Sequence, residues 1–211
     1  MCNVEFCLEN EKVTGKGAFI CIEGLDGCGK TTQAKLLAKK LWRGYNAVYT
    51  AEPSRGEIGA FIRKSCLYGE KRLSSVVEAL LFAADRLEHV ENEVLPALRQ
   101  GRLVVSDRYV YSSLAYQGAA GLSLDWIEKI NEHALRADLA VFIDVDPKIV
   151  MQRLKHTRSV MENLATQQKV REIYLKFVEK GDLVRIDGDK SKSEVAAMLF
   201  AVVLKFLKAS R

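Results

Sequence analysis

A short apolar run, a glycine-rich loop and a helical pattern follow one another between residues 18 and 42. The run at residues 18–22 contains only apolar side chains, which is typical of a strand buried on both faces of a parallel sheet. Apolar residues then recur at helical spacing from residue 31 to residue 42. A buried strand that passes through such a loop into a helix favours an α/β fold in which further strands lie parallel to the first.

Four more apolar runs alternate with helical patterns along the rest of the chain. The predicted strands cover residues 47–50, 103–106, 139–143 and 183–186. The other predicted helices cover residues 58–67, 74–99, 124–135, 147–156, 161–180 and 193–207. We expect Gly44 to end the first helix and Pro96 to end or bend the long one. This order predicts a five-stranded parallel sheet with helices on both faces.

Length and composition are those of one compact domain. The chain has 211 residues, of which 48% are hydrophobic and 28% charged, and domains usually hold about 100–200 residues. We assign residues 1–17 to an N-terminal extension and residues 18–211 to a single domain. The net charge of +5 suits an anionic substrate at least as well as nucleic acid, and we expect no nucleic-acid partner.

Cysteines and apolar runs bear on the cellular location. The five cysteines include no C-x-x-C pair, which argues against a disulfide framework and against a zinc site. The longest apolar run, residues 195–204, is shorter than the roughly 20 residues that a membrane-spanning helix needs. The first residues carry glutamates and lack the apolar segment of a secretory signal. We therefore expect a cytoplasmic protein without membrane contact.

The glycine-rich loop matches the pattern G-x-x-x-x-G-K-[ST], with a strand before it and a helix after it. Its residues are Gly24, Leu25, Asp26, Gly27, Cys28, Gly29, Lys30 and Thr31, and Thr32 follows. This pattern in this context is a P-loop, whose main-chain N–H groups bind phosphate oxygens. Lys30 is expected to contact the β- and γ-phosphates of a nucleoside triphosphate, and Thr31 to bind Mg²⁺.

A P-loop identifies the ligand and not the reaction. The chain has no Asn-Lys-x-Asp segment, which a GTPase would use to recognise guanine. A chain of this length is also too short for the larger P-loop machines. A small ATP-dependent phosphotransferase is therefore the class that we expect.

Polar residues follow the first three predicted strands. The P-loop follows the first, residues 52–55 follow the second, and Asp107 and Arg108 end the third. Ligands of open parallel sheets bind outside the carboxyl ends of the strands, so we expect one convergent site. Asp107 could hold Mg²⁺ or orient the acceptor, and Arg108 could bind a phosphate with two hydrogen bonds; both are expected to be catalytic, with Lys30.

Phe82 and Arg86 are four residues apart on the long predicted helix, so they share one of its faces. A ring and a guanidinium side by side could stack on a base and donate a hydrogen bond to its carbonyl edge. From the residues alone, a phenylalanine on a helix more often packs in the core.

Taken together, these motifs resemble those of the thymidylate kinases. The matching stretches are FICIEGLDGCGKTTQAKLLAKKL, TAEPSRGEIGAFIR, EALLFAADRLEHV, LVVSDRYVYSSLAYQGA and DLAVFIDVDP, in family order over most of the chain after residue 17. The resemblance implies a P-loop kinase fold with a short lid. It also implies Mg²⁺-dependent transfer of the γ-phosphoryl group of ATP to dTMP, and a homodimer.

The resemblance also implies roles for residues that would bind dTMP. Asp26 matches the carboxylate that binds the 3′-hydroxyl, Phe82 the ring that stacks on thymine, Arg86 the donor to a thymine carbonyl, Arg108 the contact to the phosphates, and Tyr116 the aromatic ring under the sugar. Gln117 is expected to face the base. Glu52 and Arg55 fall in the loop near the acceptor phosphate.

The lid is expected at about residues 152–162. Gly27 stands where some family members carry a basic P-loop residue, and members without that residue supply a basic side chain from the lid. Arg153, Lys155 and Arg158 are the candidates here, and we expect Arg153 to be the catalytic one.

Two alternatives remain open from the sequence. The first is another P-loop kinase, acting on dUMP or on a deoxynucleoside such as thymidine, because the 5-methyl group of thymine contributes only about 1 kcal/mol of discrimination in an apolar pocket. The second is a nucleotide-binding protein without catalytic activity.

Cys28 lies inside the P-loop, next to the start of a predicted helix. A helix N-terminus can lower the pKa of a thiol. We therefore expect Cys28 to be a reactive thiol that ATP protects from alkylation.

Overall fold

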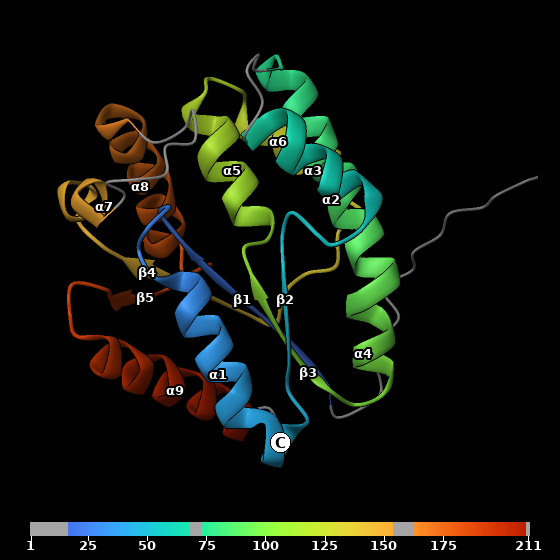
Figure 1. Cartoon of the computed structure of the whole chain (residues 1–211), viewed down its shortest axis with the longest axis vertical. Helices are drawn as coiled ribbons and strands as arrows, with labels where there is room; N and C mark the ends of the chain where they lie inside the picture. Colours follow the sequence, from blue (N-terminus) through green and yellow to red (C-terminus); the bar gives the residue numbers. More distant parts are fainter. Residues whose placement is uncertain (1–16, 68–72, 154–162, 210–211) are drawn as a thin grey trace, which may run out of the picture.

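The fold is built on one five-stranded parallel sheet (Figure 1). The computed structural model describes residues 17–67, 73–153 and 163–209. The strands are β1 (Ala18–Gly24), β2 (Val48–Ala51), β3 (Leu103–Asp107), β4 (Leu139–Asp144) and β5 (Val184–Asp187). They lie in the order β2-β3-β1-β4-β5, and every neighbouring pair is parallel. The sheet predicted from the sequence is thus confirmed, with five strands in the described residues.

The register brings the carboxyl ends of the three inner strands together. Ile22 of β1 lies opposite Asp107 of β3, and Gly24 lies opposite Ile143 of β4. β1 and β3 are almost fully buried, as expected for strands covered by helices on both faces. The P-loop therefore leaves the middle of the sheet, directly beside the end of β3.

Helices cover both faces of the sheet (Figure 1). They are α1 (Lys30–Tyr45), α2 (Glu57–Ile62), α3 (Ser75–His89), α4 (Leu95–Arg99), α5 (Val110–Ala119), α6 (Leu124–Ile130), α7 (Pro147–Arg153), α8 (Leu164–Glu179) and α9 (Lys192–Ala209). α1 packs beside α9 on one face, and α5 packs beside α8 on the other. No helix within the described ranges is both long enough and apolar enough to cross a membrane.

Several helices differ from the prediction in where they end or in how they are divided. The first helix continues through Gly44 to Tyr45, and Asn46 ends it with a left-handed φ of 48° and an N–H bond to the Trp42 carbonyl. The helix predicted at 124–135 ends at Ile130. Residues 75–99 form α3, a π-helical segment η2 (Val90–Val94) and α4, with Pro96 in the first turn of α4, so the chain stays helical past Pro96 to Arg99.

Helix α5 was absent from the sequence prediction. Six consecutive residues, 112–117, are buried, so the helix contacts the protein around most of its circumference. A helix of this kind lacks the one-sided apolar stripe that reveals amphipathic helices. Its position matters for function, because it starts two residues after Arg108 and carries Tyr116 and Gln117.

Candidate active site

The P-loop turns tightly before α1 begins at Lys30. Gly27 and Gly29 have φ values of 81° and 96°, in the left-handed region that glycine adopts without a steric cost. The Lys30 ammonium donates a hydrogen bond to the Leu25 carbonyl at 3.2 Å and lies 3.6 Å from Asp26 Oδ1. The loop therefore presents main-chain N–H groups, a lysine and a helix N-terminus at one place, which is an anion-binding arrangement.

Thr31 and Asp107 meet beneath this loop. Thr31 Oγ1 donates to Asp107 Oδ2 at 2.5 Å. The other carboxylate oxygen of Asp107 is buried and has no hydrogen-bond partner among the described residues. A hydroxyl and an unpaired carboxylate oxygen suit Mg²⁺, which takes oxygen ligands and shares them with substrate phosphates. No group of three or more His, Cys, Asp or Glu side chains in the described part could hold a metal ion.

The main chain of Arg108 has an unusual conformation. Its φ is 75°, a left-handed value that costs energy for any residue with a Cβ and often marks a functional position. The Arg108 N–H donates to the Ile22 carbonyl at 3.0 Å, and the Arg108 carbonyl accepts from Ser106 Oγ at 2.7 Å. These contacts direct the arginine side chain out of β3 towards the P-loop.

The Arg108 guanidinium connects the P-loop to α5. It donates to Asp26 Oδ1 at 2.5 Å and to Ser112 Oγ at 2.8 Å, and it lies 4.8 Å from the centre of the Tyr116 ring. Tyr116 in turn donates from its hydroxyl to Asp26 Oδ2 at 3.0 Å. Burial would raise the pKa of Asp26, but the positive charges of Arg108 and Lys30 outweigh it and hold that pKa well below its usual value. Asp26 is therefore a permanent acceptor in the site.

Arg86 lies in a buried polar cluster, and Glu52 is its main partner. Arg86 Nε and Nη2 donate to Glu52 Oε2 at 3.0 and 2.7 Å. Nη1 donates to Asn131 at 2.5 Å, and Nη2 donates to Ser113 at 3.0 Å. A guanidinium has five N–H donors, so these described contacts leave one for a ligand. The other carboxylate oxygen of Glu52, Oε1, lies 3.2 Å from His89 Nδ1. The Glu52 carboxylate is thus bound to Arg86 and His89.

The predicted base-binding residues lie on two adjoining helices. Phe82 is half-buried on α3, one turn before Arg86. Gln117 on α5 is buried, and its Oε1 has no hydrogen-bond partner within the described ranges. α3 packs against α5 (Figure 1), and the Arg86–Ser113 hydrogen bond joins them. An aromatic ring, a donor and a buried acceptor are thus carried by one helix pair.

Arg55 and Arg153 are exposed. Arg55 is close enough to Tyr49 for its charge to lower the Tyr49 pKa, although burial and the nearby Asp107 carboxylate together raise that pKa to about 12. Arg153 is the last residue of α7, and no ion pair or hydrogen bond among the described residues connects it to the P-loop. Lys155 and Arg158 lie outside the described residues. A contribution from the lid stays a prediction.

The expectation that the helix N-terminus lowers the pKa of the Cys28 thiol is wrong. Its side chain is buried, and burial raises the pKa of the thiol despite the opposing effects of Lys30 and of a main-chain hydrogen bond. Its sulfur packs against Gly24, where an added Cβ would lie 2.6 Å from Sγ. Cys28 therefore packs beneath the loop as an apolar side chain.

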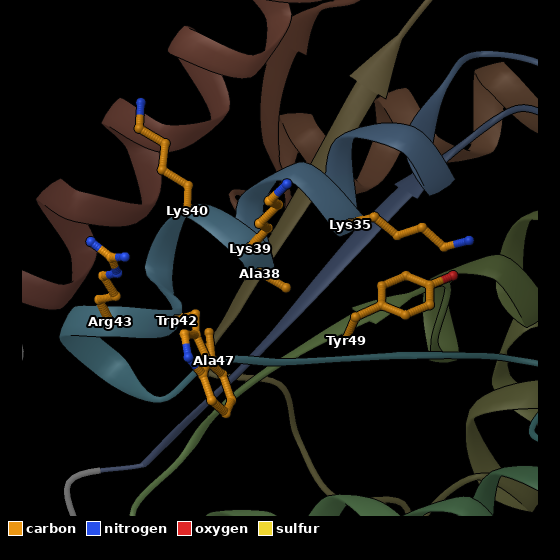
Figure 2. Close-up of a pocket in the computed structure, with 8 residues that line it drawn as sticks. All are labelled: Lys35, Ala38, Lys39, Lys40, Trp42, Arg43, Ala47 and Tyr49. Atoms are coloured by element: carbon orange, nitrogen blue, oxygen red, sulfur yellow. The ribbon is translucent and has the colours of Figure 1, made fainter.

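A separate hollow of about 420 Å³ lies on the outer side of α1 and β2. Figure 2 shows its eight lining residues, which are Lys35, Ala38, Lys39, Lys40, Trp42, Arg43, Ala47 and Tyr49. Tyr49 connects it to the site, because its ring lies 5.3 Å from the Lys35 ammonium and its hydroxyl is 3.5 Å from Asp107 Oδ2. The P-loop residues do not line this hollow.

Three residues that bind the arginines of the site were not predicted from the sequence. Ser112 binds the Arg108 guanidinium, and Asn131 and Ser113 bind that of Arg86. Ser112 and Ser113 lie four and five residues after Arg108 in sequence, which is a weak signal. Asn131 lies in a turn after α6, and no pattern in the sequence indicates it.

A parallel sheet with a P-loop in its middle, and an arginine at the next strand end, defines the class of P-loop phosphotransferases. Comparisons with known proteins give the family. A family model described as thymidylate kinase matches residues 22–199. The chain belongs to the thymidylate kinase family, and its activity at the family level is the phosphorylation of dTMP.

Comparisons with individual relatives support the same family. A probable thymidylate kinase of Pyrococcus abyssi is 47% identical over 199 residues, which cover 89% of this chain and 96% of that protein. A probable thymidylate kinase of Pyrobaculum aerophilum is 42% identical over 193 residues, covering 90% and 98%. The similarity thus extends over nearly the full length of both relatives.

Proposed function

We propose that the site at the strand ends transfers the γ-phosphoryl group of ATP to the 5′-phosphate of dTMP with the help of Mg²⁺. The observation that carries this proposal is the placement of Arg108, whose guanidinium lies between Asp26 of the P-loop and Ser112 of α5. An arginine held there can contact the donor and acceptor phosphates together. Phosphoryl transfer depends mainly on such positioning and on charge neutralisation.

ATP would bind through the P-loop. The main-chain N–H groups of residues 24–32 and the Lys30 ammonium would hold the phosphates, and Thr31 and Asp107 would hold Mg²⁺. Mg²⁺ bound there would neutralise charge on the β- and γ-phosphates. The buried, unpaired Asp107 oxygen supports this assignment. The acceptor is a phosphate anion, so the protein needs no strong general base.

The nucleoside of dTMP would bind between the P-loop, α3 and α5. The 3′-hydroxyl would donate to ionised Asp26, and Tyr116 would lie under the sugar. Phe82 would stack on thymine, the remaining N–H of Arg86 would donate to a thymine carbonyl, and Gln117 Oε1 would accept from the ring N–H. Arg55 and Arg153 would add positive charge near the phosphates.

We expect a substrate panel to separate the possible functions. ADP release with ATP and Mg²⁺ should be fastest with dTMP and slower with dUMP, UMP, dCMP and thymidine. A rate with dUMP or thymidine that equals the dTMP rate would contradict the proposed acceptor. Release of no ADP in a single-turnover experiment with any acceptor would indicate a nucleotide-binding protein without activity.

We also propose a homodimer in the cytoplasm. Apolar side chains on neighbouring helices are exposed, namely Phe61 on α2 and Val76, Val77 and Leu80 on α3, with exposed fractions between 43% and 49%. Four such side chains on adjoining helices form an apolar surface that a second copy of the chain would cover.

Leu80→Glu is expected to convert the dimer to a monomer, because it places a charge inside the proposed interface. Size-exclusion chromatography with light scattering measures the mass. Trp42→Glu is the matched control, since Trp42 is 52% exposed on α1, and this variant should remain dimeric. A monomeric wild-type protein, or a dimeric Leu80→Glu variant, would contradict this interface.

A further inference from the structure

A buried carboxylate lies behind Arg108 and has no part in the phosphate chemistry proposed above. Glu23, the residue before Gly24 in β1, is fully buried. Its Oε1 accepts a hydrogen bond from the Tyr109 N–H at 2.9 Å. Its Oε2 accepts from the Ser112 hydroxyl at 2.6 Å and from the Tyr174 hydroxyl at 2.9 Å. A buried carboxylate needs such donors to offset its loss of hydration.

The first link from Glu23 to Arg108 runs through the main chain. The Tyr109 N–H belongs to the peptide group directly after Arg108, whose φ is 75°. A left-handed arginine persists only where its surroundings fix it. Glu23 fixes the peptide on the C-terminal side of Arg108, while the Ile22 carbonyl fixes the N–H of Arg108 itself.

The second link runs through Ser112. This hydroxyl accepts from Arg108 Nη1 at 2.8 Å and donates to Glu23 Oε2 at 2.6 Å. A serine hydroxyl has one donor, so the acceptance by Glu23 orients that hydroxyl with its lone pairs towards Arg108. The carboxylate thus controls both the main chain and the guanidinium of the same arginine.

Arg108 and a few neutral polar groups surround the Glu23 carboxylate and affect its pKa. Burial raises the pKa of Glu23 to about 7, and the positive charge of Arg108 is the main opposing charge. The other groups of the described residues that act on the carboxylate are the hydroxyls of Ser112 from α5 and Tyr174 from α8 and the Tyr109 N–H. The Cys21 thiol of β1 and the Tyr111 hydroxyl of α5 also feel its charge, and burial raises the pKa of both.

We propose that Glu23 is a positioning residue for phosphoryl transfer, which holds Arg108 in the geometry that contacts the phosphates. This inference rests on the proposed function of Arg108. The ionised carboxylate accepts all three hydrogen bonds, whereas the protonated form must use one oxygen as a donor. Ionised Glu23 is therefore the form that holds Arg108.

Steady-state kinetics of Glu23→Gln and Ser112→Ala test the proposal. The amide of Glu23→Gln keeps the shape but donates where the carboxylate accepted. Ser112→Ala removes the hydroxyl that links Glu23 to the guanidinium and leaves the Tyr109 link to the main chain in place. Both should lower kcat about 10- to 100-fold, the usual effect of replacing an outer positioning partner, with the KM values for ATP and dTMP changed less than threefold. Asp138→Asn is the control, because Asp138 also accepts a β1 N–H, that of Phe19 at 2.7 Å, at the far end of the strand.

A double-mutant cycle shows whether Glu23 acts through Arg108. Adding Glu23→Gln to Arg108→Ala should cost no further activity, since the arginine that Glu23 positions is gone. Independent, multiplying losses would overturn the proposal. If wild-type protein itself fails to phosphorylate dTMP in this assay, the proposed function fails instead, so the two failures are distinguishable.

The pH dependence gives a readout that a purely structural role would not change. The wild-type kcat should fall as the pH falls through about 7, because Glu23 becomes protonated, and Glu23→Gln should lack this inflection. The substrate phosphate titrates near pH 6 in both proteins and serves as the internal reference. Identical pH profiles for the two proteins would overturn the proposal.

Thermal unfolding measures the titration of Glu23 independently of activity. The pKa of Glu23 is higher in the folded protein than its ordinary value of 4.5, so the stability gained from its protonation is lost as the pH rises through about 7. The Tm of Glu23→Gln relative to wild type should therefore rise between pH 5 and pH 8, while its activity stays low. A relative Tm that stays constant or falls over this range would show that Glu23 does not titrate there, and would overturn the part of the proposal in which the ionised form holds Arg108.

Discussion

Replacing Arg108 with Ala is expected to lower kcat for dTMP phosphorylation by about 10³-fold, the size of effect reported for an arginine that neutralises a transferring phosphoryl group. The guanidinium contacts Asp26 and Ser112 and sits where the two phosphates would meet. The substitution leaves the P-loop backbone and Lys30 in place. ATP affinity, measured by calorimetry, should therefore change by less than tenfold.

Two further variants sharpen this test. Arg108→Lys keeps the charge but loses the planar group that can bind two oxygens, so its kcat should lie between those of wild type and Arg108→Ala. Arg102→Ala is the matched control, since Arg102 precedes β3 at the opposite end of that strand and lies 5.9 Å from the Trp42 ring. A kcat within tenfold of wild type in Arg108→Ala would contradict the role of Arg108.

Arg86→Ala is expected to lower the free energy of unfolding by about 3–5 kcal/mol, the usual cost of removing one member of a buried ion pair. The side chains of Arg86 and Glu52 are only 1% and 3% exposed, so the substitution leaves the Glu52 carboxylate buried without its main partner. It also removes the donors to Asn131 and Ser113. Urea denaturation followed by circular dichroism measures the change.

A second substitution separates stability from recognition. Arg86→Ala combined with Glu52→Gln removes the unpaired charge and should recover part of the lost stability. Neither protein should recover the affinity for dTMP, because the donor to the thymine carbonyl is missing in both. Equal losses of ATP and dTMP binding in the double variant would contradict the assignment of Arg86 to the base.

The sheet and the P-loop could be predicted because their signals are local. Each buried strand is a short apolar run, and the P-loop is a fixed pattern between a strand and a helix. The end of α1 was predicted one turn early, because glycine at residue 44 is tolerated inside the helix and Asn46 supplies the left-handed turn. Helix α5 gave no signal, since burial around most of its surface removes the amphipathic pattern.

The site was predictable where residues follow strand ends, as Asp107 and Arg108 do. The pairing of Arg86 with Glu52 and Asn131 joins residues 34 and 45 positions apart, and no sequence pattern specifies it. The pKa of the Cys28 thiol was predicted in the wrong direction because it depends on burial, which only the folded packing determines. Glu23 looks like an ordinary polar end of a strand until its three donors are known, which are the Tyr109 N–H, Ser112 of α5 and Tyr174 of α8.

The contacts that build the site also constrain how the protein folds. The Arg108–Asp26 bond joins residues 82 positions apart, and the Tyr174–Glu23 bond joins residues 151 positions apart. Contacts of such high sequence separation form late, because the entropy of closing long loops must be overcome first. A nucleotide bound at this site would therefore stabilise the complete sheet against global unfolding, and partly folded chains would gain nothing from it.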